Sequence, residues 1–176
     1  MASIDAIIVS SLRRFLHEVE SKKWRGRERD AVSLFAFGAL LHELKHGLPR
    51  FDARQIGIEV ALNQGFKRPR GGKERANKDL VIWRKPFSTA WSGGSPLAVL
   101  EWKVDSEEKS ASVNARELKT MRSWLTSYLA RNRATRGYGF HLQLHDGRRP
   151  TVVSVSRFAN GKRSGDLRDM VVENSD

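Results

Sequence analysis

The chain has 176 residues and contains no cysteine, which excludes disulfides and thiolate metal sites. Hydrophobic residues make up 39% and charged residues 30% of the sequence, as is typical of a single globular domain. Lys and Arg total 32 against 20 Asp and Glu, so the net charge is +12, and the sequence pI is about 10.6. A pI above about 9 is typical of nucleic-acid-binding domains, although charge alone does not separate them from proteins that bind anionic membranes.

The N-terminal apolar run is too short for a signal peptide. It covers residues 4–9 and contains Asp5, and no stretch of membrane length follows it. Together with the absence of cysteine, this predicts a soluble cytoplasmic protein without a membrane partner.

The first predicted element is an amphipathic helix over residues 4–21, packed on the core as an accessory helix. Its apolar positions recur at three- and four-residue steps and are Ile4, Ile8, Leu12, Phe15, Leu16 and Val19. A second helix is expected over 31–46, with Asp30 as N-cap and with Gly47 and Pro49 as the stop signal. This helix is apolar over most of its circumference, which predicts that it is buried.

The second helix ends in His42-Glu43-Leu44-Lys45-His46, which matches the H-E-x-x-H pattern. Histidines four residues apart share one helix face and can bind zinc, with the glutamate as general base. However, Lys45 places a charge at an inner position, and His and Lys are also favoured in a last helical turn by the helix dipole. A zinc metallopeptidase is therefore a distant third alternative, and ordinary helix-terminal residues are the preferred interpretation.

Three strands are predicted next, over residues 55–62, 78–83 and 97–104. In the first, Ile56, Ile58, Val60 and Leu62 alternate with polar residues, so Glu59 is expected on the polar face. The stretch 64–77 between the first two strands is expected to be a basic loop, suited either to contacting phosphates or to forming a solvated hairpin tip. Its cations are Lys67, Arg68, Arg70, Lys73 and Arg75.

Charged residues interrupt the apolar pattern of the second and third strands. Asp79 opens one strand, and Glu101-Trp102-Lys103 lies near the end of the next. Because side chains alternate along a strand, Glu101 and Lys103 share one face while Trp102 points to the other. A charged pair in an apolar strand is costly, so a functional role is preferred over a structural ion pair at a sheet edge.

A third helix follows over 114–129, with Asn114 and Glu117 as a capping pair and with Arg116 and Lys119 off its apolar stripe. Strands are predicted over 138–144 and 151–158, joined by a turn at Asp146-Gly147. The polar tail from residue 160 to 176 is expected to be a short helix or disordered.

The order of elements predicts an α/β fold with a mixed central sheet flanked by helices. The first three strands form an antiparallel meander, and the crossover helix makes the next strand parallel to a neighbour. The expected divisions are an accessory helix and linker over 1–26, a core over 27–160 and the tail over 161–176.

This order and these residues resemble the PD-(D/E)XK nuclease superfamily, which has the restriction-endonuclease-like fold. The resemblance covers about Asp30 to Leu144 and rests on the α-β-β-β-α-β order with Asp79 and Glu101-Trp102-Lys103 on adjacent strands. The proline of the family name is Lys78 here. The Gln-x-x-x-Tyr signature of the RecB-like branch is absent, because Trp124 stands four residues before Tyr128.

The resemblance implies a metal-dependent nuclease, most simply a DNA endonuclease using Mg²⁺, with Mn²⁺ as a substitute. Asp79, Glu101 and the Trp102 carbonyl would bind the metal, with Glu59 and Glu28 as further candidate ligands, and Lys103 would orient the attacking water. DNA is favoured over RNA as the partner, and Arg116, Lys119 and the basic loop would contact it. Cutting both strands with one site per chain usually needs two copies, so a homodimer is one expected assembly. The alternative is a non-catalytic nucleic-acid-binding protein of the same fold.

Overall fold

The computed structural model describes residues 2–48, 51–67, 73–89, 94–105, 111–144 and 152–171, and for 63–67, 73–76, 111–113 and 166–171 it describes the backbone alone. The helical elements are α1 (Ile4–Ser21), α2 (Glu28–Ser33), the π-helix η1 (Leu34–Leu40), α3 (Leu41–Gly47), the short η2 (Ala53–Gln55) and α4 (Ala111–Arg131). The strands are β1 (Ile56–Lys67), β2 (Lys73–Trp83), β3 (Pro96–Asp105), β4 (Arg136–Gln143), β5 (Val152–Ala159) and β6 (Lys162–Val171).

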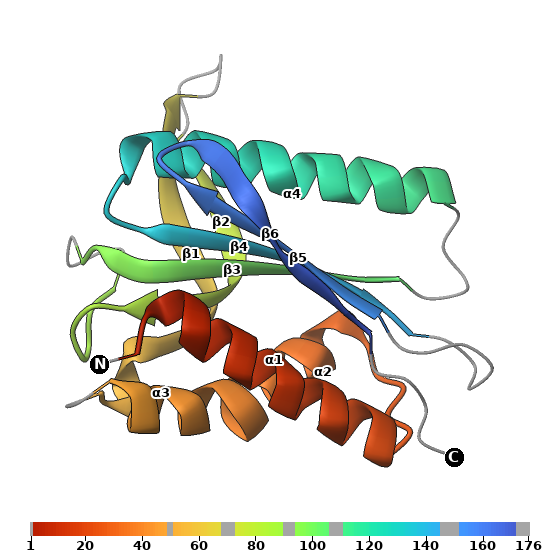
Figure 1. Cartoon of the computed structure of the whole chain (residues 1–176). Coiled ribbons are helices and arrows are strands. Elements are labelled where there is room, and N and C mark those ends of the chain that lie inside the picture. Colours follow the sequence, from red (N-terminus) through yellow and green to blue (C-terminus); the bar gives the residue numbers. More distant parts are fainter. Residues whose placement is uncertain are drawn as a thin grey trace.

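A six-stranded mixed sheet lies at the centre, with the strands side by side in the order β1-β2-β3-β4-β5-β6. Among the strands that the structure describes, only β3 and β4 run parallel, because α4 crosses over between them, and every other neighbouring pair is antiparallel. Figure 1 shows α1, α2 and α3 together on one face of the sheet and α4 on the other. The predicted α/β fold with a mixed, helix-flanked sheet is confirmed.

The N-terminal helix α1 spans the predicted residues 4–21. Ser3 caps it by accepting a hydrogen bond from the backbone N–H of Ala6 at 3.1 Å. Its apolar stripe is buried, as the three- and four-residue spacing predicts, and it packs on η1. Among the described helices, none is long and apolar enough to cross a membrane.

The second helical segment starts earlier than expected, so the prediction that Asp30 is its N-cap is wrong. Arg27 is the N-cap, and Asp30 in the first turn accepts a hydrogen bond from the Arg27 N–H at 3.2 Å. Glu28 is therefore the first residue of α2 rather than a residue just before the helix. The middle of the segment is the π-helix η1, which the apolar pattern does not reveal, and the segment ends at Gly47 as predicted.

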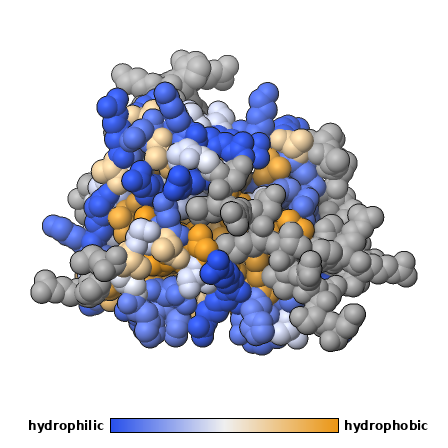
Figure 2. All heavy atoms as spheres, in the orientation of Figure 1, coloured by the Kyte–Doolittle hydropathy of each residue, from blue (hydrophilic) through white to orange (hydrophobic). Residues whose placement is uncertain are grey.

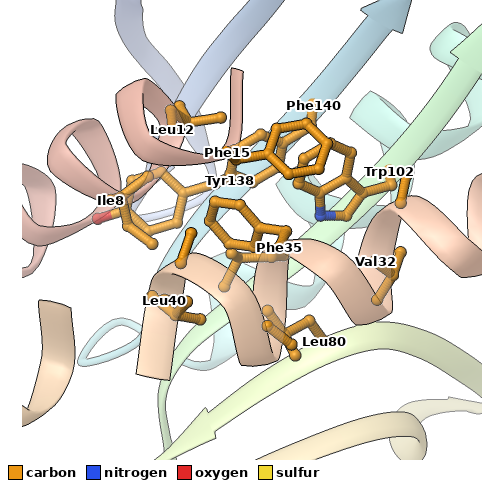
Figure 3. Packing of buried hydrophobic residues seen from close by; sticks show 14 of the residues in the cluster. Ile8, Leu12, Phe15, Val32, Phe35, Leu40, Leu80, Trp102, Tyr138 and Phe140 are labelled. Atoms are coloured by element: carbon orange, nitrogen blue, oxygen red, sulfur yellow. The ribbon is translucent and has the colours of Figure 1, made fainter. Parts of the chain in front are cut away.

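Aromatic rings form the centre of the core between the sheet and α1–η1 (Figure 3). Trp102 is fully buried, stacks on Phe140 with ring centroids 4.4 Å apart, and lies 5.3 Å from Phe15 and 5.1 Å from Phe35. A one-residue slip of β3 would move this ring to the opposite face, so the ring fixes the register. Its neighbours Glu101 and Lys103 are thereby directed away from this core.

Strand β1 changes the face on which its apolar side chains are buried, which differs from the predicted simple alternation. Ile56 and Ile58 pack against the core under α1–α3, whereas Val60 and Leu62 pack against the second core under α4. The change occurs at Glu59, whose φ of 51° is left-handed. Strands β1 and β2 also extend over residues 64–67 and 73–77, so most of the expected basic loop is a long hairpin instead.

Two further expectations about the C-terminal half are corrected. Helix α4 begins at Ala111, so Asn114 lies inside the helix and is not its cap. Within the tail, Lys162–Val171 form a sixth strand, β6, paired antiparallel with β5, rather than a short helix or a disordered segment, and residues 172–176 lie outside the described part of the chain. Lys162, Arg163 and Ser164 are exposed on this edge strand, and polar edge strands lack the apolar alternation that marks a buried one.

Candidate active site

The candidate site is built around the edge of β3 that β2 leaves uncovered. The pairing of β2 with β3 ends at Leu80 and Leu100. Beyond that point, Asp79 Oδ2 accepts the Trp102 N–H at 2.7 Å, and Glu28 Oε2 accepts the Val104 N–H at 3.3 Å. The two carboxylates thus accept the backbone hydrogen bonds that carbonyl groups of a neighbouring strand would otherwise accept. These hydrogen bonds connect α2 and β2 to β3.

Glu101 is paired with Lys78. In the sequence, Lys78 has no predicted role and only stands where the family name has a proline. The two side chains form an ion pair, and each is 8% exposed. Burial raises the pKa of Glu101 to about 8, and the nearby carboxylate of Asp79 adds to the increase, while Lys78 opposes it. The Lys78 ammonium also lies 3.6 Å from the centroid of the Trp124 ring on α4.

Lys103 does not pair with Glu101, although both belong to the predicted charged motif. Its ammonium contacts Glu28 Oε1 at 2.8 Å across the open edge of β3. Burial acts to lower the pKa of Lys103, but the hydrogen bond and charge of Glu28, together with the charges of Asp79 and Glu101, outweigh it and raise the pKa. Lys103 is therefore a protonated hydrogen-bond donor at neutral pH.

Glu59 lies beside the site in a strained conformation. A non-glycine residue in the left-handed region costs roughly 1–3 kcal/mol and persists only where its surroundings fix it. The Glu59 carboxylate pairs with Arg29, with Arg29 Nε 2.9 Å from Oε1 and Nη2 3.1 Å from Oε2. An open, shallow pocket is lined by Glu28, Arg29, Val32, Ile58, Glu59 and Asp79.

A further polar pair, which sequence reasoning missed, continues the face of Glu101 and Lys103. His141 Nε2 lies 2.7 Å from Asp105 Oδ2, and the parallel register places His141 next to Lys103. The alternation around His141 marked a strand, but no local signal in the sequence indicated its partner.

The remaining predicted site residues lie elsewhere or outside the described side chains. Arg116 and Lys119 are exposed on α4, in a region where hydrophilic side chains dominate the surface (Figure 2, top). Of the basic stretch, Arg68 and Arg70 lie outside the described residues. The side chains of Lys67, Lys73 and Arg75 lie outside the description as well.

The histidines of the H-E-x-x-H pattern stack on each other on α3. Their ring centroids are 4.2 Å apart, and His46 Nδ1 lies 2.7 Å from the His42 carbonyl oxygen. Within the described ranges, no group of three or more His, Asp or Glu side chains is placed to hold a metal ion. A zinc enzyme normally needs three protein ligands, so this geometry does not favour a peptidase.

The donor set around β3 does fit a hard divalent cation. Mg²⁺ keeps several waters and is commonly bound through one or two carboxylates, so Asp79 and Glu101 with the Trp102 carbonyl suffice. That carbonyl points to the same edge as the Trp102 N–H, as in any strand. Burial is the main reason that the pKa of Glu101 is raised, and the nearby carboxylate of Asp79 adds to it, an effect that a bound cation would offset.

Comparisons with protein-family models, with curated proteins and with solved structures find no match for this chain.

Proposed function

We propose that the protein is a Mg²⁺-dependent nuclease that hydrolyses phosphodiester bonds, with DNA as its substrate. The observation that carries the proposal is the convergence of Glu28, Asp79 and Glu101 with Lys103 at one open strand edge. These residues come from α2, β2 and β3 and are up to 75 positions apart in the sequence. Carboxylates that can bind a cation, and an ammonium that can stabilise developing negative charge, are groups that metal-assisted phosphodiester hydrolysis can use.

Each side chain has a role that follows from its position. Asp79 and Glu101, with the Trp102 carbonyl, would hold the cation, which when bound neutralises phosphate charge and lowers the pKa of a coordinated water. Lys103, kept protonated by Glu28, would orient the attacking water and stabilise the developing negative charge. Lys78 contacts Glu101 Oε1 and holds that side chain in place.

The polarity of the surface supports a polyanionic substrate. The net charge of +12 favours association with nucleic acid, and Arg116, Lys119 and Arg122 are exposed on α4. These cations offer phosphate contacts, which position a nucleic acid without reading its sequence.

A non-catalytic nucleic-acid-binding protein is the second candidate. One observation favours it: Glu28 and Glu101 already have lysine partners, and Asp79 already accepts a backbone hydrogen bond. A charged cluster satisfied in this way could serve folding alone while the basic surface binds nucleic acid.

Cleavage of plasmid DNA and short DNA and RNA duplexes with Mg²⁺ or Mn²⁺ distinguishes the two candidates. For a nuclease, Glu101→Ala and Lys103→Ala should abolish cutting and leave salt-sensitive binding largely intact. The exposed Glu18→Ala on α1 is the matched control and should cut normally. Equal activity in the wild type and both site variants would refute the assignment.

The expected homodimer and the zinc-peptidase alternative each have a test of their own. Nicked products would indicate a single acting copy, whereas double-strand breaks together with a dimer by light scattering would support the expected homodimer. For the peptidase alternative, stoichiometric zinc that is lost in His42→Ala would be required.

A further inference from the structure

The pocket beside the candidate site is lined by several carboxylates and by one cationic residue. Among the residues that line it, all of which belong to the described part of the chain, Arg29 is the only cation, beside the carboxylates Glu28, Glu59 and Asp79. Glu28 forms an ion pair with Lys103, and Asp79 accepts the Trp102 N–H. Glu28 and Asp79 therefore already have partners other than Arg29.

The guanidinium of Arg29 is held in the geometry with which arginine binds a phosphate. Its Nε and Nη2 atoms reach the two oxygens of Glu59 at 2.9 and 3.1 Å, which is the two-pronged arrangement common to carboxylate and phosphate ligands. Arg29 and Glu59 are 76% and 46% exposed. An ion pair this exposed is weak, so an incoming anion can replace it.

The backbone of Glu59 indicates that this carboxylate is placed where it is for a reason other than strand formation. Its left-handed φ of 51° interrupts β1 between Ile58 and Val60, which pair with Leu80 and Lys78. Glu59 therefore stands directly across from Asp79. Strained residues of this kind gather at functional sites.

We propose that Arg29 binds a phosphate of the nucleic-acid backbone in this pocket, and that Glu59 occupies the guanidinium until the phosphate displaces it. The proposal rests on the proposed function for the class of ligand, a nucleic acid, but it does not require cleavage. In the free protein, the Glu59 carboxylate then binds the Arg29 guanidinium at the position that a phosphate would take. Arg29 in turn positions a phosphate next to Asp79 and Glu28.

Fluorescence anisotropy with a short labelled DNA duplex in EDTA tests the exchange, because no cutting occurs without metal. Arg29→Gln should weaken binding about tenfold through loss of a two-pronged charged contact. Glu59→Gln should tighten binding about threefold, because it removes the competitor of a weak pair. The double variant should bind as weakly as Arg29→Gln alone, since Glu59 acts only through Arg29.

A purely electrostatic effect predicts a different result. The two changes alter the net charge in opposite directions and their effects would add, so the double variant would bind only about threefold more weakly than the wild type, and that result would overturn the proposal. Arg29→Lys keeps the positive charge but cannot donate two parallel hydrogen bonds to a phosphate, so it should also weaken binding of the DNA duplex. Wild-type affinity in Arg29→Lys would contradict the proposal as well.

The exposed pair Glu18 and Lys22 on α1 provides the matched control. Glu18→Gln and Lys22→Gln should change affinity slightly and additively. If the protein cuts DNA but the effects of the Arg29 and Glu59 changes on binding affinity are additive, the exchange at Arg29 is refuted and the proposed nuclease function is not. If the effects on affinity are not additive but the protein never cuts, the nuclease function is refuted and the exchange at Arg29 is not.

Discussion

Lys78 and Glu101 form an ion pair that is almost completely withdrawn from water beneath the ring of Trp124. Charges in such a place are costly, and removing one partner leaves the other uncompensated. The pair therefore links the stability of the fold to the candidate site.

The first prediction concerns this pair. At pH 9, where Glu101 is ionised, Lys78→Met should lower the free energy of unfolding by about 3–5 kcal/mol, because it leaves a buried carboxylate without its counter-ion. The double variant Lys78→Met/Glu101→Gln should recover most of the loss. Urea unfolding in EDTA measures both, and equal losses in the single and double variants would show that the two residues are not coupled.

The second prediction concerns pH. The folded pKa of Glu101 is about 8 and the unfolded value about 4.5, so between these values the native state binds a proton that the unfolded state does not. The free energy of unfolding should therefore fall as pH rises from about 4.5 to about 8, by up to about 1.4 kcal/mol per pH unit. Above pH 8 this contribution should be constant.

Glu101→Gln should remove that fall, whereas the exposed Glu18→Gln should keep it. The pKa of Glu18 is lowered by its hydrogen bond to Lys22, so its contribution is lost only in acid. Urea unfolding at a series of pH values in EDTA checks this, and parallel curves for wild type and Glu101→Gln would contradict it.

The third prediction separates two roles of Asp79. Asp79→Asn keeps an oxygen for the Trp102 N–H and should preserve stability, whereas Asp79→Ala leaves that N–H unpaired and should cost about 1–3 kcal/mol. Both variants should lose cleavage, because the amide is a poor ligand for a hard cation. A cleaving Asp79→Asn variant would remove Asp79 from the metal site.

The fourth prediction concerns the left-handed backbone at Glu59. Glu59→Val should destabilise the protein by about 1–3 kcal/mol, because a β-branched residue tolerates this φ least, and Glu59→Gly should be tolerated better. The half-buried Ser154 on β5, whose φ is not in the left-handed region, is the control. There the order should reverse, with Val tolerated better than Gly. Thermal unfolding of the Val and Gly variants at Glu59 and at Ser154 shows which substitution is better tolerated at each position.

Local patterns in the sequence predicted most of the fold, because helix and strand periodicity follow directly from burial. Helix α1 and the central strands lie where the spacing placed them. The conformation of Glu59 could not be predicted, since Ile56, Ile58, Val60 and Leu62 read as one alternating face whatever the φ between them. The sixth strand was missed because an exposed polar edge strand carries no apolar alternation.

For the site, the sequence identified the groups but not their partners. It predicted that Glu101 and Lys103 share a face, and it named Glu28 as a further candidate. It did not predict that Glu101 pairs with Lys78 and Lys103 with Glu28, because both pairings depend on where β2 leaves β3. Such long-range contacts are set by the sheet as a whole.

The carboxylates on the open edge of β3 have a consequence for how the molecule behaves in a crowded solution. An uncovered strand edge with free N–H groups can add a strand from another molecule and start aggregation. Asp79 and Glu28 occupy the N–H groups of Trp102 and Val104, so these groups are not free to pair with a strand of another molecule. Losing both carboxylates would free the two N–H groups and should favour edge-to-edge self-association.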